Sequence, residues 1–178
     1  MGSNELLVFD TGPLSHFARE NRLGALKAVV GTRTAVIPDV VVDELRVGAA
    51  LDTRVQAALD ATWIEHRELR SGQELAAFAS FSSLLVKGGR NRGEAGVLAL
   101  ASTTGGLAVV DDGAARKAAE TAGIQLRPTL TLLCDAINML LTIPLVAVLA
   151  DDLLSGQYHL PFGPGGFEKW ARDNDLFP

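Results

Sequence analysis

Acidic residues stand in this 178-residue sequence where an open parallel sheet would bring them to one edge. Asp10 ends the apolar run 6–9, and the pair Asp111 and Asp112 ends the apolar run 107–110, while Glu44 and Glu94 lie in segments with helical patterns. Functional groups of open parallel sheets gather beyond the carboxyl ends of the strands. Carboxylates brought together there repel one another unless a cation lies between them, and hard oxygen ligands suit Mg²⁺ or Mn²⁺. The spacing therefore predicts a divalent-metal site.

Each acid alone also has a simpler explanation. An acid at a strand end is usually a helix cap or a turn residue, and Glu94 in the first turn of a helix is favoured by the macrodipole. Of two adjacent acids, one enters the pocket while the other caps the next helix. We expect Asp10, Glu94 and Asp111 to hold the metal, with Glu44 in the cluster and Asp112 in a supporting or water-mediated role. Their joint placement favours a site over separate caps.

Several other side chains could assist this chemistry. Thr11 is a candidate for orienting the metal or contacting the substrate, and Arg116 for neutralising the acids or touching a phosphate, although a structural ion pair explains Arg116 equally well. The basic residues beside Glu94 are candidates for holding a nucleic-acid backbone, or they form a solvated loop; they are Lys87, Arg90 and, nearest, Arg92. The three histidines match no motif, so we expect them to be surface or core residues.

The elements that must position these residues alternate along the chain. Strands are expected at 5–9, 34–37, 63–64, 107–110 and 124–126, with helices between them at about 13–17, 23–30, 39–47, 55–59, 73–86, 94–102 and 114–122. The helix at 39–47 is expected to take Asp39 as its N-cap, and the one at 73–86 to be amphipathic. Such alternation predicts an α/β fold with a parallel sheet and helices on both faces.

Length and composition set the broad class. The chain fits one domain, 48% of its residues are hydrophobic, and its net charge of −5 argues against a surface that holds nucleic acid by bulk charge alone. Segment 137–149 is apolar, but Pro144 interrupts it and charges flank it, so we expect two core helices joined near Pro144 and no membrane span. The single cysteine, Cys134, is expected to be a buried hydrophobe and indicates a reducing, cytoplasmic setting. No signal peptide is expected, because a strand and an acid occur within the first ten residues.

Four motifs together resemble the PIN-domain family. They are Asp10-Thr11-Gly12-Pro13-Leu14, Pro38 followed by Glu44-Leu45, Gly93-Glu94-Ala95 with 98–101, and Val110-Asp111-Asp112 with Ala115-Arg116. Their order and spacing over residues 5–140 look most similar to the VapC-like PIN nucleases, whose first motif reads Asp-Thr-Gly-Pro-Leu. Two departures from the family pattern are Arg127-Pro128-Thr129, where a glycine-and-threonine turn is usual, and a longer tail after Leu154.

The resemblance implies a three-layer α/β/α PIN-like nuclease domain at 1–154, with an extension at 155–178 packed on it. It implies hydrolysis of RNA phosphodiester bonds with Mg²⁺ or Mn²⁺, with Asp10, Glu44, Glu94 and Asp111 or Asp112 as the acidic cluster. A small antitoxin protein and a homodimer are the partners it suggests. Two alternatives stay open: a catalytically silent PIN-like binding module, and another metal-dependent phosphoesterase. An aspartyl nucleophile would want a second acid two residues on, and position 12 is glycine.

Overall fold

The computed structural model describes residues 5–137 and 141–176. Its centre is a four-stranded, all-parallel sheet in the order β3-β2-β1-β4. The strands are β1 (Leu6–Phe9), β2 (Thr34–Pro38), β3 (Ile64–Arg67) and β4 (Leu107–Val109). Apolar side chains on both faces explain why β1, β2 and β4 are buried almost throughout. This confirms the predicted α/β class with a parallel sheet.

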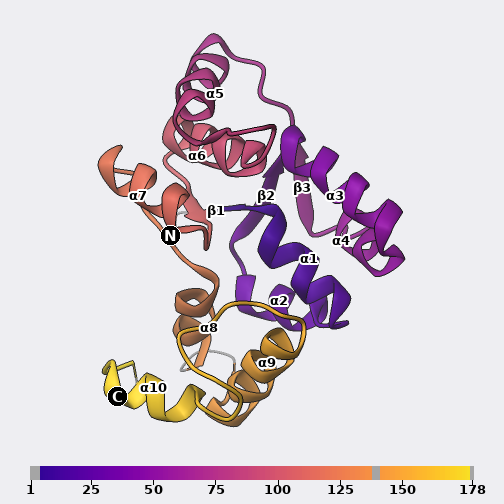
Figure 1. Ribbon diagram of the computed structural model, residues 1–178, viewed down its shortest axis with the longest axis vertical. Helices are drawn as coiled ribbons and strands as arrows, with labels where there is room; N and C mark the ends of the chain where they lie inside the picture. Colours follow the sequence, from indigo (N-terminus) through magenta and orange to yellow (C-terminus); the bar gives the residue numbers. More distant parts are fainter. Residues whose placement is uncertain (1–4, 138–140, 177–178) are drawn as a thin grey trace.

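Helices cover both faces of the sheet. Helices α1 to α4 lie on one side of the strands, and α5 and α6 lie on the other (Figure 1). Their bounds are α1 (Thr11–Arg19), α2 (Leu23–Val30), α3 (Asp39–Leu51), the 3₁₀ turn η1 (Thr53–Val55), α4 (Gln56–Leu59), α5 (Gly72–Leu85), α6 (Arg92–Thr104) and α7 (Gly113–Thr121). Right-handed crossovers between parallel strands produce this three-layer α/β/α arrangement. None of the described helices has the length and apolar character that a membrane span requires.

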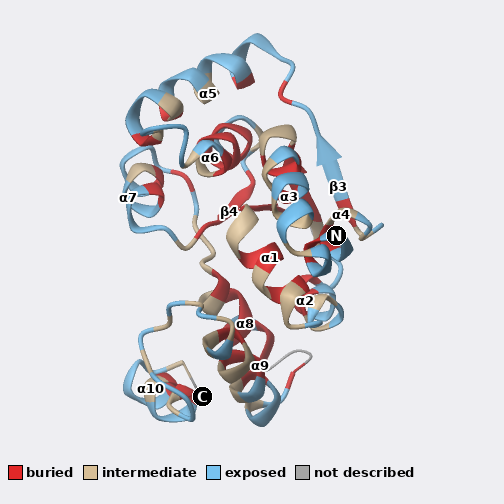
Figure 2. Ribbon diagram, turned by 45° about the vertical axis from the view of Figure 1, so that its right-hand side comes forward, coloured by how far each residue is buried: buried red, intermediate tan, exposed pale blue. Residues whose placement is uncertain are grey.

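Helix α6 is the most deeply buried of the helices that reach the candidate site. It packs against β1, β2, β4 and α3, and all its residues from Ala95 to Ala101 are buried (Figure 2). The close approach depends on Gly96, where a Cβ would overlap Val40 and lie 3.3 Å from Cγ of Pro38. Small residues on α6 therefore bring its N-terminus to the carboxyl edge of the sheet.

Three further helices form the C-terminal part of the molecule. Helix α8 (Thr129–Ile137) packs on α9 (Ile143–Ser155), and α10 (Phe167–Asp173) packs on α9. Phe162, Phe167 and Trp170 form an aromatic cluster beside α10. The tail contains the short helix α10, and the division of the chain at residue 154 stays a prediction.

Local expectations were wrong in three places. Residues 124–126 form no strand, because only one parallel bridge, Ala108 to Leu126, pairs this segment with β4 before the chain turns away. Helix α3 begins at Asp39 with Pro38 as its N-cap, and the Asp39 carboxylate instead accepts from the Leu69 amide. Helix α5 is not cleanly amphipathic, since Leu75 and Leu84 are 51% and 63% exposed. Two helices meet near Pro144 as expected, since α8 ends at Ile137 and Pro144 lies in the first turn of α9; residues 138–140 between them are outside the described residues.

Candidate active site

Asp10 lies at the centre of the carboxyl edge of the sheet. It follows β1 directly, its backbone amide donates to Val109 of β4, and its side chain is only 7% exposed. Its Oδ1 is buried and has no hydrogen-bond partner. Burial raises the pKa of the Asp10 carboxyl well above its ordinary value, and the charges of Glu94 and Glu44 raise it further, against backbone hydrogen bonds from Thr11 and Gly12. A buried, unpartnered carboxylate oxygen is costly unless it has a ligand to bind.

Glu44 approaches Asp10 from α3. Its Oε2 accepts from the Thr11 hydroxyl at 2.5 Å, and its Oε1 accepts from the backbone amide of Gly93 at 2.8 Å. A Cβ at Gly93 would overlap the Glu44 carboxylate and lie 3.0 Å from Asp10 Oδ1. Glycine therefore lets α6 begin against two carboxylates from two other elements. Thr11, expected to orient the metal or contact the substrate, instead orients Glu44 in this structure.

Glu94 and Asp112 extend the acidic cluster toward solvent. Glu94 lies in the first turn of α6 and is half-buried. Burial raises the pKa of its carboxyl, and so do the charges of Glu44 and Asp112. Asp112 is exposed, and its Oδ1 caps α7 by accepting from the amides of Ala114 and Ala115, both at 2.9 Å. Asp112 therefore has the helix-cap role expected for one member of the pair, and its charge also raises the pKa of Glu94.

Asp111 is occupied elsewhere. Its Oδ1 accepts from the Thr129 amide at 2.9 Å, and its Oδ2 accepts from the Thr129 hydroxyl at 2.6 Å and from the Tyr158 hydroxyl. Burial raises the pKa of Asp111, whereas the Thr129 hydrogen bonds and the charge of Arg116 lower it. The structure thus turns Asp111 toward α8 and the tail, so its geometry does not support the expectation that Asp111, and not Asp112, is the metal ligand.

Thr129 and Tyr158 were not among the candidates drawn from the sequence. Thr129 had one detectable signal, because it stands after Pro128 at the start of a helix, but nothing in that local pattern names Asp111 as its partner. Tyr158 had none, since 47 residues separate it from Asp111. Only the folded chain brings the two together.

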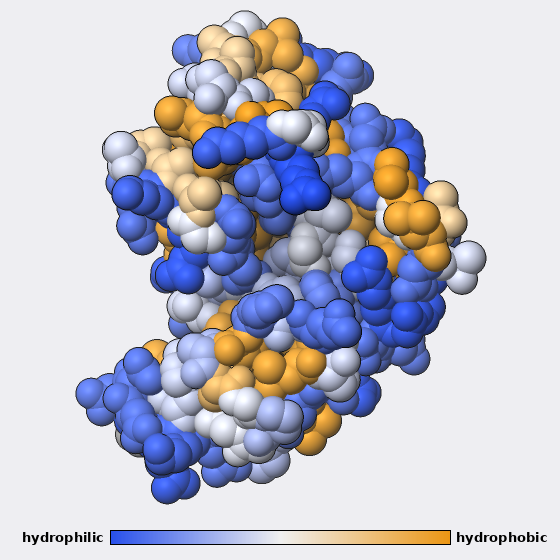
Figure 3. Space-filling model, viewed as in Figure 1, coloured by the Kyte–Doolittle hydropathy of each residue, from blue (hydrophilic) through white to orange (hydrophobic). Residues whose placement is uncertain are grey.

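One basic residue, Arg92, lines a cavity beside the acidic cluster. A cavity of about 290 Å³ beside the cluster is lined by Val40, Asp43, Glu44, Val47, Gly89 and Arg92. In a space-filling view the molecule is hollowed where α1, α3 and α6 meet, with hydrophilic side chains around the hollow (Figure 3). Arg92 is exposed at the start of α6 and close to Glu44 in this lining.

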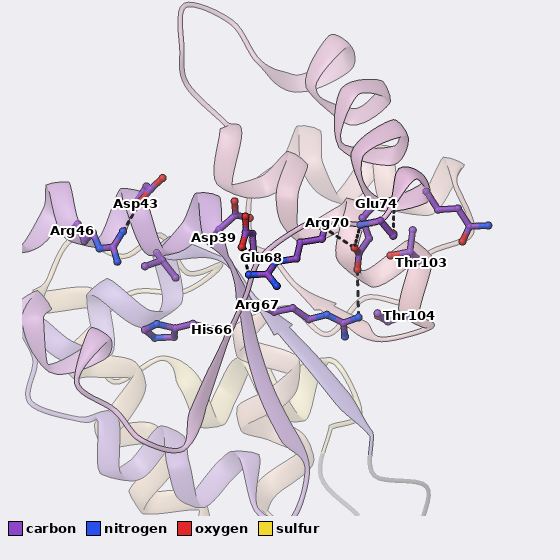
Figure 4. A pocket seen from close by; sticks show the side chains of 13 residues that line it. Asp39, Asp43, Arg46, His66, Arg67, Glu68, Arg70, Glu74, Thr103 and Thr104 are labelled. Atoms are coloured by element: carbon purple, nitrogen blue, oxygen red, sulfur yellow. Dashed lines mark hydrogen bonds and ion pairs between the residues drawn. The ribbon is translucent and has the colours of Figure 1, made fainter.

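A larger groove, of about 1080 Å³, lies between α3, β3 and α5 (Figure 4). Its arginines are already paired: Arg46 with Asp43, Arg67 with Glu74 and Arg70 with Glu68. Glu74 also completes a capping box with Ser71, and hydrogen bonds from the backbone amides of Ser71 and Arg70 lower its pKa. These carboxylates have protein partners, unlike Asp10 Oδ1, so this groove is not the better candidate for metal chemistry.

The acidic residues fit a hard divalent cation in donor chemistry. Asp10 supplies an unpartnered buried oxygen, and the charge of Glu44 raises the pKa of Asp10. Gly93 has no side chain and so lets α6 begin against both carboxylates. Among the described residues, no three acidic, histidine or cysteine side chains already form a preassembled metal cage. The arrangement is one that a cation would stabilise by drawing carboxylates together.

Comparison with known families decides the classification. A family model described as a PIN domain matches residues 6–161, most of the chain. The chain belongs to the PIN-domain family. The acidic edge of this PIN domain is accordingly the candidate active site of a nuclease-type hydrolase, and nucleic acid is its general class of substrate. No protein of curated function matches the sequence.

Proposed function

We propose that this PIN-domain protein is an endoribonuclease that depends on Mg²⁺ or Mn²⁺ and acts as the VapC-like toxin of a toxin–antitoxin pair. The observation that supports it best is the unpartnered Asp10 Oδ1, buried beside Glu44 and Glu94 at the sheet edge. Structural carboxylates in proteins are paired or hydrogen-bonded. Carboxylates that repel one another at the carboxyl edge of a nuclease fold are what we expect of a cation site.

Each residue has a distinct task in this proposal. Asp10, Glu94 and Asp112 hold the cation, and Asp112 replaces Asp111 in the set suggested by the sequence. Glu44 is held by Thr11 and Gly93 and keeps negative charge beside Asp10. When bound, the cation would supply Lewis-acid activation of water and charge stabilisation for in-line displacement at a phosphodiester. Arg92 binds a backbone phosphate of the RNA at the mouth.

Cleavage of RNA by the purified protein tests the reaction. We expect labelled single-stranded and hairpin RNAs to be cut with Mn²⁺ or Mg²⁺ and to stay intact with EDTA. Asp10→Asn and Glu94→Gln should abolish cleavage and weaken Mn²⁺ binding in calorimetry. Glu68→Gln, an exposed acid of the larger groove, is the matched control and should behave as wild type.

Other outcomes would support the alternatives. Hydrolysis of a generic phosphomonoester without RNA cleavage would indicate another phosphoesterase. Normal folding with no heat on Mn²⁺ addition and no cleavage would indicate a silent binding module. Wild-type turnover by Asp10→Asn would overturn the site assignment.

The toxin role has a separate test in cells. Expression of the wild-type protein alone should arrest growth, whereas the Asp10→Asn form should not. A small protein encoded by an adjoining gene should restore growth if it is the antitoxin. For the homodimer, the partly exposed Leu145 and Val148 of α9 are the apolar contacts we propose; Val148→Asp should convert a dimer to a monomer in light scattering.

A further inference from the structure

The tail after α9 reaches into the acidic edge through one side chain. Tyr158 follows the end of α9, where its amide donates to the Leu153 carbonyl at 3.0 Å. Its hydroxyl donates to Asp111 Oδ2 and lies 3.2 Å from the Thr129 hydroxyl. Its ring packs edge-on against His16 of α1, with ring centroids 4.7 Å apart. Tyr158 therefore connects the tail, α1, α8 and the end of β4.

Asp111 is held at both oxygens by this connection. Thr129 donates from its amide and its hydroxyl, and Tyr158 donates from its phenol, so the carboxylate accepts three hydrogen bonds from two segments beyond β4. Hydrogen bonds to a charged carboxylate are each stronger than neutral ones. The backbone at the end of β4 is thereby fixed in rotation as well as in place.

Fixing Asp111 determines where Asp112 points. Adjacent side chains of an extended chain leave the backbone in opposite directions, and Asp112 has extended backbone, φ −61° and ψ 131°. With Asp111 bonded toward α8, Asp112 is directed toward α7, whose N-terminus it caps, and toward Glu94 of α6, whose carboxyl its charge affects. Helices α6 and α7 are in contact.

We propose that Tyr158 is a positioning residue for the metal site: by holding Asp111 against Thr129, it orients Asp112 toward Glu94, the acid whose charge acts on Asp10. This inference rests on the proposed metal-dependent function and assigns a task to the C-terminal tail in it. Tyr158 touches neither substrate nor cation. Its role is to set the geometry of a carboxylate that does.

Tyr158→Phe removes the hydroxyl and keeps the ring against His16. We expect the Kd for Mn²⁺ to rise about 10-fold, at the low end of what losing an orienting group costs a metal site. We expect kcat on RNA to fall with it while KM for RNA stays unchanged, because Arg92 is untouched. Thr129→Val should act similarly, and Thr129→Ser, which keeps the donor, should restore wild-type Mn²⁺ affinity.

The wild-type protein offers a second measurement that needs no variant. Tyr158 is the only tyrosine in the sequence, so ¹³Cζ-tyrosine labelling gives one NMR resonance. Addition of Mg²⁺ should shift this resonance with the same Kd that calorimetry gives, and the shift should vanish in Asp10→Asn. A structural tail contact alone would leave the resonance unmoved.

The outcomes separate this inference from the function on which it rests. If the wild type binds neither Mg²⁺ nor Mn²⁺, the proposed function fails. If the wild type binds metal but the tyrosine resonance does not respond, the positioning role is overturned. A folded Tyr158→Phe protein with wild-type Mn²⁺ affinity and kcat would overturn it as well.

Discussion

At the scale of single residues, the candidate site consists of carboxylates whose burial and mutual repulsion disfavour their charged forms. The pKa of Asp10 and that of Glu94 are raised, first by burial and then by neighbouring carboxylates. An acid with a higher pKa in the folded state binds its proton more tightly there than in the unfolded chain. Without a cation, the free energy of unfolding contributed by this site therefore falls as pH rises from about 4 through the folded-state pKa values.

Asp10→Asn should relieve this cost. In EDTA at pH 7 we expect the variant to exceed wild type in free energy of unfolding by about 1–3 kcal/mol, the usual penalty of a buried group without partners. The difference should shrink as pH falls toward about 4, the ordinary carboxyl pKa, because the folded wild-type carboxyls are then protonated and no charge stays buried. Urea unfolding at the two pH values measures both quantities. A wild type that is more stable than the variant at pH 7 would contradict the prediction.

The two adjacent aspartates should separate in their effects. Asp112→Asn keeps the α7 cap, because asparagine caps helices as well as aspartate, so we expect unchanged thermal stability with RNA cleavage reduced at least 100-fold. Asp111→Asn disturbs a carboxylate that accepts three hydrogen bonds and should cost about 1–3 kcal/mol of stability. Thermal melts and cleavage rates of both variants check this. Greater loss of Mn²⁺ affinity in Asp111→Asn at preserved stability would restore Asp111 as the ligand.

Residue types and spacing could predict the acids but not the task of each. Asp10 follows a strand end and Glu94 lies in the first turn of a helix, positions readable from local pattern, whereas Glu44 lies in the second turn of α3. The structure brings the three acids to one edge. The orientation of Asp111 depends on Thr129 and Tyr158, and the Tyr158 contact depends on how a distant tail folds back. The hydrogen bonds that orient Glu44 likewise join α1, α3 and α6, which no local pattern contains.

At the scale of elements, the site depends on how closely α6 approaches α3 and β1. Gly93→Ala would place a Cβ into the Glu44 carboxylate, the movable end of a side chain, so we expect the fold to survive and Glu44 to be displaced. Cleavage should fall at least 10-fold with little change in melting temperature. Gly113→Ala is the matched control, because nothing lies within 4 Å of its Cβ position at the start of α7. Equal activity of the two variants would contradict the assignment.

Segments that are buried almost throughout were predicted better from the sequence than segments at the edge of the fold. The apolar runs of β1, β2 and β4 and the pattern of α6 carry enough buried residues to be read directly from the sequence. Residues 124–126 carry the same composition as a strand but meet β4 at one bridge only, since Pro128 and α8 follow at once. Exposure of Leu75 and Leu84 on α5 was unpredictable, because helical spacing does not say which face another element covers.

At the scale of the whole molecule, a nucleic-acid substrate must approach a protein with a net charge of −5. Long-range attraction between opposite net charges therefore cannot hold the substrate. Binding depends instead on basic side chains at the mouth of the acidic hollow. Arg92 lines that mouth, whereas Arg70 lies in the larger groove and is paired with Glu68. Both arginine side chains are exposed, but Arg92 lines the smaller cavity and Arg70 the larger groove. Arg70 therefore serves as the matched control for Arg92.

Arg92→Gln should raise KM for RNA several-fold, leave kcat nearly unchanged, and reduce the slope of log affinity against log salt by about 0.7, the value for one lost phosphate contact on a single strand. Arg70→Gln should change none of these. Binding of a non-cleavable RNA by the Asp10→Asn protein at 50 to 200 mM salt measures the slope without turnover. An equal change of slope in both variants would mean that RNA crosses the larger groove as well, because a contact confined to the hollow cannot sense a charge beside β3.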